Sequence, residues 1–113
     1  MPDRLLLFDT VALSNFALGG ALDLLVTRYG ASLGVTNEVL DEVIEGVSAG
    51  YPTLKDVVGL VDKGTFASVV MEREERNIFG ELIGHLGPGE ASCVAVATCR
   101  DGTVVTDDRA ARD

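Results

Sequence analysis

The sequence is short of cations, of histidine and cysteine, and of long apolar runs. Its 113 residues include nine Lys and Arg against eighteen Asp and Glu, which gives a net charge of −9. Bulk electrostatic binding of nucleic acid, or of an anionic membrane surface, needs a basic face, so the composition excludes both classes. The longest apolar run, residues 5–8, is far too short for a membrane span, and the N-terminus lacks a signal-peptide pattern. We therefore expect a cytoplasmic protein with no membrane contact.

The scarcity of histidine and cysteine also limits the kinds of metal and catalytic site that the protein can contain. One histidine, and two cysteines without a Cys-x-x-Cys spacing, argue against a zinc site. No Gly-x-Ser-x-Gly elbow accompanies His85, which stands at a predicted helix end where a cation suits the helix dipole. Cys93 and Cys99 are six residues apart in a predicted helix, about 9 Å along its axis and too far for a disulfide. We expect both to be small, buried side chains in a reducing compartment.

What the sequence does contain is an alternation of short apolar strands with helices, over a length that suits one domain. The strands are expected at residues 5–9, 32–35, 65–70 and 103–106. The helices are expected at residues 12–28 with a break at Gly19-Gly20, from 37 to near 50, 54–62, 71–86 and 90–99, with another starting at 109. Continuous apolar strands and right-handed crossovers favour a parallel sheet with helices on both faces. The fold class is therefore α/β, a three-layer α/β/α arrangement with a central, mainly parallel sheet of about four strands.

Polar residues and a Gly-Pro-Gly segment mark the expected helix ends. Thr10 and Thr36 follow the first two strands, where a hydroxyl side chain makes a good N-cap. Gly87-Pro88-Gly89 is typical of a stop between two helices. The helix after this stop is rich in Ala and Val, so we expect it to be the most buried helix.

The acidic residues at the ends of these elements are more informative than their number. Asp9 ends the first predicted strand, and Asp107 and Asp108 end the fourth. Glu90 opens the buried helix. Because ligands in parallel α/β sheets bind at the carboxyl ends of the strands, we expect these acids to share one edge of the sheet.

Gathered carboxylates repel one another unless a cation lies among them. Close like charges raise each other's pKa and oppose ionisation. Oxygen ligands suit Mg²⁺ or Mn²⁺, which lower the pKa of a bound water and neutralise charge on a phosphodiester. Glu38 and Glu42, one turn apart on the helix after the second strand, are further candidates. The pattern indicates a divalent-metal site through which an acidic protein would cut nucleic acid.

Each acid also has an ordinary structural interpretation. Glu90 suits the first turn of a helix, where the dipole favours an anion. Asp107-Asp108 suits a turn and helix cap, and Glu38 or Glu42 taken alone suits a solvated helix face. Asp9 is the strongest single candidate, because an acid that ends a buried strand usually has a function.

Four segments, in their order and spacing, resemble the PIN domain, the fold of Mg²⁺- or Mn²⁺-dependent ribonucleases that includes VapC-like toxins. The segments are Leu6–Thr10 with Leu13 and Asn15, Val35–Val43, Leu86–Ser92 and Val104–Arg112. The Gly-Pro-Gly-Glu-Ala form of the third segment is similar to a PIN subgroup other than the best-known toxins. The resemblance covers about residues 5–112. It implies a divalent-metal-dependent ribonuclease that hydrolyses RNA phosphodiesters, the toxin-like component of a toxin–antitoxin pair.

The resemblance also implies which residues do this. The catalytic acids are Asp9, Glu42, Glu90 and Asp108, and the metal ligands are Asp9, Glu90 and Asp108 with Asp107 as an alternative. Glu42 fits the second acid better than Glu38 because it follows an apolar residue, Val39, by three positions. The side chains expected to hold a carboxylate or a metal-bound water are Thr10, Ser14, Asn15 and Thr106. The implied cofactor is Mg²⁺ or Mn²⁺.

The C-terminus departs from the family pattern. PIN domains usually continue past the Thr-x-Asp segment with a full helix and a final strand, whereas this chain stops at Asp113. We therefore expect residues 1–113 to form a single PIN-like domain that lacks this C-terminal part. An exposed sheet edge would then be covered by a partner or a second copy. The expected partners are an RNA substrate, an antitoxin protein and a second copy in a homodimer.

Two other functions fit some of these observations. A non-catalytic PIN-like module that acts through protein contacts is favoured by the short C-terminus, the acidic balance and the presence of only two lysines. A phosphoryl-transfer enzyme built around Asp9 fits less well. A haloacid-dehalogenase-type phosphatase wants a second Asp at the position of Val11, and a receiver domain wants a Lys on the last strand.

Overall fold

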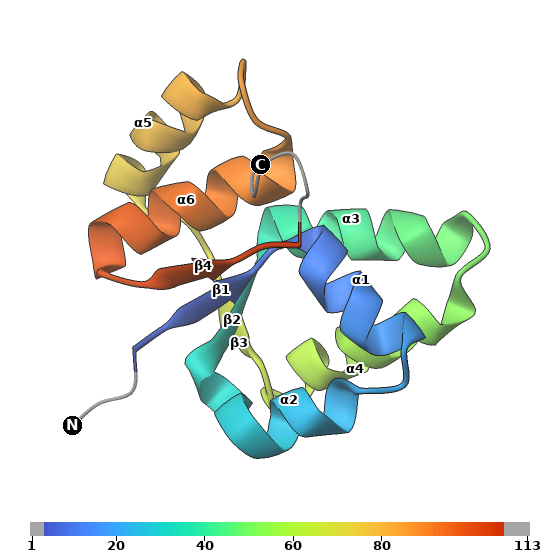
Figure 1. The fold of residues 1–113 in the computed structure, drawn as a ribbon. Helices are drawn as coiled ribbons and strands as arrows, with labels where there is room; N and C mark the ends of the chain where they lie inside the picture. Colours follow the sequence, from blue (N-terminus) through green and yellow to red (C-terminus); the bar gives the residue numbers. More distant parts are fainter. Residues whose placement is uncertain (1–3, 108–113) are drawn as a thin grey trace.

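Four short parallel strands lie at the centre of the computed structural model, which describes residues 4–107 (Figure 1). They run in the order β3–β2–β1–β4, with bounds β1 Leu6–Phe8, β2 Leu33–Thr36, β3 Ala67–Val69 and β4 Thr103–Val105. Leu6 of β1 is in register with Leu33 of β2 and with Thr103 of β4. Because every pair is parallel, the carboxyl ends of all four strands lie at one edge.

Helices connect the strands on both sides of the sheet. Their bounds are α1 Thr10–Leu18, α2 Leu22–Tyr29, α3 Asn37–Ser48, α4 Lys55–Asp62, α5 Arg73–Leu82 and α6 Pro88–Arg100. The steps β1 to β2 and β2 to β3 go one way along the sheet and the step β3 to β4 goes the other, so right-handed crossovers fall on opposite faces. Figure 1 shows α5 and α6 on one side and α1, α2 and α4 on the other. The predicted α/β fold class is confirmed.

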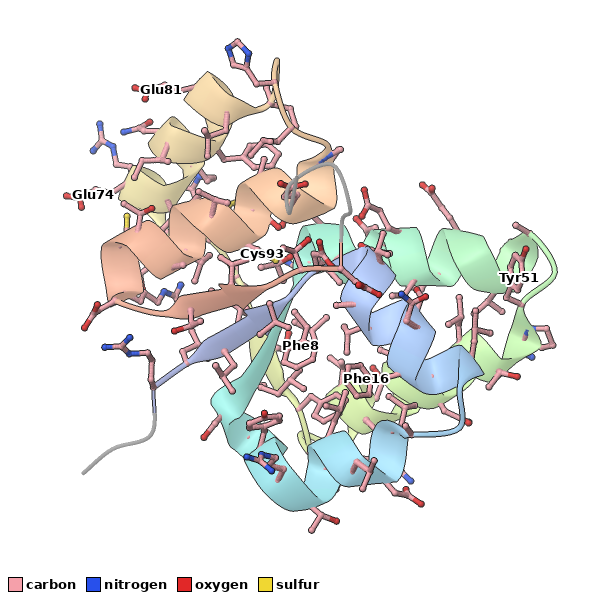
Figure 2. All side chains as sticks on the ribbon, in the orientation of Figure 1. Phe8, Phe16, Tyr51, Glu74, Glu81 and Cys93 are labelled. Carbon is pink, nitrogen blue, oxygen red and sulfur yellow. The ribbon has the colours of Figure 1, made fainter. Side chains whose placement is uncertain are left out.

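The apolar core forms on both faces of β1 and β2. Leu7, Leu33 and Val35 of these strands are almost fully buried. Phe8 of β1 meets Phe16 of α1 edge to face, with ring centroids 6.0 Å apart (Figure 2). Helix α6 buries more residues than any other helix described, as expected from its Ala and Val content: Gly89, Ala91, Ser92, Cys93, Ala95 and Val96. Its N-terminus is therefore held firmly against the sheet.

One expectation about the first helical segment is confirmed and another is wrong. The segment expected over 12–28 is broken at Gly19-Gly20 as expected, and it forms the two helices α1 and α2, with a φ of 73° at Gly20. The N-cap of α1 is Asp9 and not Thr10, because the Asp9 carboxylate accepts the backbone N–H of Ala12 at 2.9 Å. Thr36 caps α3 as expected, through Val39 N at 3.1 Å.

Two expectations about α6 also need correction. Gly87-Pro88-Gly89 does not stop a helix but begins one, since proline is favoured in a first helical turn and Gly87 is the N-cap. Cys93 is buried but Cys99 is exposed. Six helical residues turn through about 600°, so the two cysteines lie about 120° apart around the axis and cannot both face the sheet. The helix expected from residue 109 lies outside the described residues.

No single helix within residues 4–107 is long and apolar enough to cross a membrane. The pair Thr10–Leu18 and Leu22–Ser32 meets the criterion for length and composition together, but it is bent by 117°.

Candidate active site

Three acidic side chains from distant parts of the chain line one cleft of about 160 Å³. Asp9 comes from the end of β1, Glu42 from α3 and Glu90 from the first turn of α6. Thr10, Val11 and Gly87 complete the lining. We call the three carboxylates Asp9, Glu42 and Glu90, with the space between them, the acid cleft. It lies at the carboxyl end of β1, where Figure 1 shows the first turns of α1 and α3 beside the start of α6.

Asp9 is buried to all but 4% of its surface and is held from two sides. Its Oδ1 accepts the N–H of Ala12 in the first turn of α1. Its Oδ2 accepts the hydroxyl of Thr106, which directly follows β4, at 2.5 Å. Asp9 therefore ties the ends of two neighbouring strands to the start of a helix, which fixes its orientation.

Glu42 is held between α1 and α6. Its Oε1 accepts the hydroxyl of Thr10, and its Oε2 accepts the backbone N–H of Gly89 at 3.3 Å. Glu38, one turn earlier on α3, is not among the residues that line the cleft. The structure thus brings Glu42 to the acid cleft, as the sequence pattern favoured, and leaves Glu38 in the first turn of its helix.

Buried hydroxyls lock α3 against α6 beneath the cleft. Ser92 Oγ donates to Gly89 O at 2.7 Å, so its only proton is used there. Thr36 Oγ1 lies 2.7 Å from Ser92 Oγ and therefore donates to it. Thr36 and Ser92 have no exposed surface. This chain of bonds fixes the distance between the helix that carries Glu42 and the helix that carries Glu90.

The remaining candidates are placed less closely around the cleft. Asn15 Nδ2 donates to Asp107 Oδ2, which joins α1 to the segment after β4. Asp107 is half-buried and is not among the residues lining the cleft. Ser14 is half-buried on α1 and is not among them either. Asp108 lies outside the described residues.

A family model described as DUF3368, a PIN domain, matches residues 5–113. The chain belongs to the PIN domain family. PIN domains are generally nucleases, which supports a hydrolase role for this one. No curated protein matches the sequence.

Two solved structures share this PIN fold. One is VapBC2 from Rickettsia felis bound to a DNA fragment from their promoter, at a TM-score of 0.64 and 16% identity. That match covers 96% of this chain and 91% of the other. The second is PAE2754 from Pyrobaculum aerophilum, at a TM-score of 0.62 and 18% identity, covering 94% of this chain and 82% of the other. At these identities the similarity shows the fold alone.

The donor chemistry of this PIN domain's acid cleft suits a hard divalent cation. Within residues 4–107, no group of three or more Asp, Glu, His or Cys side chains stands close enough to hold an ion as they are placed. Asp9 and Glu42 point instead to the local hydroxyl and N–H donors described above. The cleft nevertheless offers carboxylate and hydroxyl oxygens, the ligands that Mg²⁺ and Mn²⁺ prefer.

The thiol nearest the cleft does not belong to this donor set. Burial, together with the negative charge of Asp9, raises the pKa of Cys93 to about 12. The Cys93 thiol lies 3.7 Å from Phe8 O, to which it donates. At this pKa the Cys93 thiol stays protonated near neutral pH. Because only a thiolate is a good metal ligand, Cys93 has a structural role.

Sequence reasoning missed a buried ion pair at the other end of α6. Glu75 is 2% exposed, and its two carboxylate oxygens accept Arg100 Nε at 2.6 Å and Arg100 Nη2 at 2.8 Å. Arg100 Nη2 also donates to Val70 O at 2.9 Å. The hydrogen bonds to Arg100 lower the pKa of Glu75 below its ordinary value. Only its place three residues after Glu72 distinguishes Glu75 locally, because it accepts the Glu72 N–H at 2.7 Å in a capping box. Its neighbour Glu74 projects outward (Figure 2).

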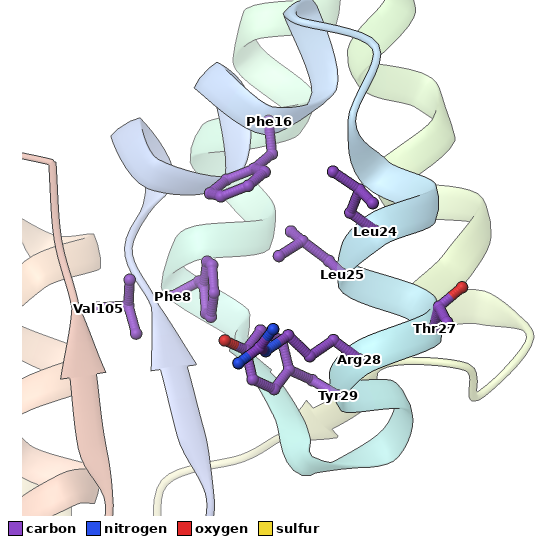
Figure 3. A pocket seen from close by; sticks show the side chains of 8 residues that line it. All are labelled: Phe8, Phe16, Leu24, Leu25, Thr27, Arg28, Tyr29 and Val105. Carbon is purple, nitrogen blue, oxygen red and sulfur yellow. The ribbon is translucent and has the colours of Figure 1, made fainter.

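Sequence reasoning also missed an apolar pocket of about 610 Å³ beside β4 (Figure 3). It lies between the β1–β4 side of the sheet and α2, and Figure 3 shows Phe8, Phe16 and Leu25 pointing into it. Arg28 also lines the pocket, with its guanidinium carbon 5.9 Å from the centre of the Tyr29 ring. The pocket requires α2 to lie apart from the β4 edge, which no local pattern predicts.

Proposed function

We propose that this PIN domain is a divalent-metal-dependent ribonuclease whose catalytic acids are Asp9, Glu42, Glu90 and Asp108. The observation that carries the proposal is the acid cleft, which three carboxylates far apart in the sequence line at the carboxyl-end edge of the parallel sheet. That edge is where ligands bind in folds of this kind. Asp108 is included among the catalytic acids because its Thr-x-Asp segment resembles that of PIN domains, and Asp107 is the alternative metal ligand.

The proposed cofactor is Mg²⁺ or Mn²⁺, held by Asp9 and Glu90 with Asp108 or Asp107. When bound, the ion would activate a water and neutralise charge on an RNA phosphodiester. The protein's own part is to hold the acids in place. Thr106 and Ala12 orient Asp9, and Thr10 orients Glu42.

The acidic composition is compatible with an RNA substrate under this proposal. The net charge of −9 argues against a broad electrostatic interface with RNA. A bound divalent cation would cancel part of the negative charge of the cleft's carboxylates and would offer the scissile phosphate a positive partner there. The substrate would therefore be recruited through the metal and through contacts around the cleft.

We further propose that the chain is the toxin of a toxin–antitoxin pair and forms a homodimer. VapBC2, which shares the fold, was crystallised as a complex on promoter DNA. Large apolar side chains stand exposed on the first two helices: Val11 at 49%, Leu18 at 50% and Leu24 at 67%. Exposed apolar surface beside a pocket of this kind usually marks a contact with another protein. Light scattering of the chain alone, and mixed with a candidate antitoxin protein, tests both partners.

The nuclease activity is tested on a labelled single-stranded RNA with Mn²⁺, with Mg²⁺ and with EDTA. The expected result is cleavage with either metal, no cleavage in EDTA, and no cleavage by Asp9→Asn. Cleavage that persists in EDTA, or that survives Asp9→Asn, would refute the proposal. Glu75→Gln is the matched control, because it removes an equally buried carboxylate outside the acid cleft.

The second candidate function is a non-catalytic module that acts through protein contacts. The pocket of about 610 Å³ favours it, because most of its lining residues are aromatic or aliphatic. The two functions separate in one experiment. A module predicts a stable complex and no Mn²⁺ binding, whereas Mn²⁺ binding that is lost in Glu90→Gln would count against it.

A further inference from the structure

Gly89 is one of two helix glycines within residues 4–107 at which a side chain from another element fills the space beside the Cα; the other is Gly46, beside Leu54 Cδ1. A Cβ at this position would overlap Glu42 Oε1 and would lie 3.1 Å from Glu42 Cδ and 2.9 Å from Thr10 Oγ1. By contrast, a Cβ at Gly80 of α5 would meet nothing within 4 Å. Gly87, two residues before Gly89, is equally unrestricted. Among the helix glycines of residues 4–107, only position 89 is crowded by a carboxylate oxygen.

Backbone conformation does not explain this glycine. Gly89 is the second residue of α6 and is not among the residues with positive φ. Glycine in a helix is ordinarily less favourable than alanine, so a gain elsewhere has to offset it. The Glu42 carboxylate supplies that gain, because it accepts the Gly89 N–H and the Thr10 hydroxyl from the space that a Cβ would occupy.

The same bonds use the electrostatics of the helix start. The N–H groups of the first helical turn have no partner within the helix, and the helix dipole favours a negative charge there. The Gly89 N–H donates to the carboxylate of Glu42, which belongs to a different helix, α3. The position of Glu42 is thus set by the close approach of α3 to the start of α6.

We propose that Gly89 is a positioning residue for the acid cleft, whose missing side chain is the space in which Glu42 docks against α6. The inference rests on the proposed function for its role in metal binding, but the docking itself can be measured without metal. Replacement by alanine would move the Glu42 carboxylate away from Thr10 and from the N-terminus of α6. Glu42→Asp removes the overlap, because the shorter side chain does not reach the Cβ.

The test is a double-mutant cycle of Gly89→Ala and Glu42→Asp, with Gly80→Ala as control. Urea unfolding in EDTA and Mn²⁺ affinity are measured for each protein. Gly80→Ala should raise the urea midpoint, as a helical Gly→Ala change ordinarily does. Gly89→Ala should lower it in the presence of Glu42 and raise it in the Glu42→Asp background. Mn²⁺ affinity should fall about tenfold or more in Gly89→Ala, and much less when the change is made in Glu42→Asp.

The outcomes separate the inference from the proposed function. If Gly89→Ala raises the midpoint equally in both backgrounds and leaves Mn²⁺ affinity unchanged, the positioning role is refuted. If the unfolding data show the coupling but the unmodified chain binds no Mn²⁺, the metal site is refuted and the docking of Glu42 stands. Coupling in both measurements supports both.

Discussion

The two ends of α6 hold carboxylates in opposite ways. At the C-terminal end, Arg100 neutralises Glu75 through two hydrogen bonds, so the chain provides its own cation. At the N-terminal end, Asp9 and Glu42 are held by hydroxyl and backbone N–H groups. The ion pairs found within residues 4–107 involve Arg4 or Arg100, and neither cation pairs with Asp9 or Glu42.

This difference teaches how one acidic protein uses carboxylates for two purposes. Glu75 joins α5 to α6, and its charge is already balanced, so its role is mechanical. Among residues 4–107, Asp9 and Glu42 are oriented by neutral donors and pair with no cation, which leaves their charge available to a cation from solution. Carboxylates that bind a metal are commonly oriented by hydrogen bonds from neighbouring groups, as Asp9 and Glu42 are.

The largest expected effect separates the two ends by activity. Asp9→Asn should lower metal-dependent RNA cleavage by at least about 100-fold, because loss of a ligand exceeds the loss of an outer partner. Asparagine caps a helix about as well as aspartate, so the free energy of unfolding should change by no more than about 1 kcal/mol. Initial cleavage rates and urea unfolding of the same samples measure both. A fall in rate that is matched by unfolding of the variant would contradict this explanation.

The next effect separates the two ends by stability. Glu75→Gln should destabilise the fold by about 2 kcal/mol, because it removes the buried counter-ion of Arg100 and leaves only the exposed Glu72, 3.9 Å away. A larger value is not expected, since the Arg100 side chain is 32% exposed and water screens it in part. Urea unfolding gives the value. A change below about 0.5 kcal/mol would show that the pair contributes little to stability.

The pH dependence of stability should report the Glu75 end. The pKa of Glu75 is lowered by its hydrogen bonds to Arg100, from an ordinary value of 4.5. Such a group stabilises the fold fully above its unfolded pKa, and the contribution is lost as the pH falls through the lower folded value. The stability gap between the unmodified chain and Glu75→Gln should therefore stay constant from pH 7 to about 5 and shrink below 4.5. A gap that shrinks near neutrality would contradict this assignment.

The smallest effect uses the two cysteines as reporters, one toward each end. Cys99 is exposed beside the Glu75–Arg100 pair, and Cys93 is buried next to the acid cleft with a pKa of about 12. A thiol reagent at pH 8 should modify one cysteine per native chain and two cysteines per unfolded chain. Modification of the native chain should leave its free energy of unfolding unchanged. Peptide mapping should find the native label on Cys99. Rapid native labelling of Cys93 would mean that the floor of the cleft opens easily.

Much of the fold could be predicted from local pattern. The strands, the cap at Thr36 and the burial of α6 followed from apolar runs, helix-cap preference and Ala–Val content. The expected cap at Thr10 was wrong, because Asp9 serves both as the end of a strand and as the cap. Position in a helix alone also could not separate Cys93 from Cys99, since the neighbouring elements decide which side is covered.

The candidate site was predictable only in outline. An acid at a strand end and another at a helix start are local features, so Asp9 and Glu90 could be selected from the sequence. The preference for Glu42 over Glu38 rested on a family pattern, and its physical reason is the approach of α3 to Gly89, which only the packed structure reveals. The Glu75–Arg100 pair joins residues 25 apart and carries no local signal.

Mn²⁺ binding by calorimetry tests the central claim most directly, that the acid cleft holds a divalent cation. The unmodified chain, Asp9→Asn and Glu75→Gln are titrated under the same conditions. The expected result is saturable binding to the unmodified chain and to Glu75→Gln, with binding lost in Asp9→Asn. No binding to the unmodified chain, or equal binding to all three proteins, would contradict the claim.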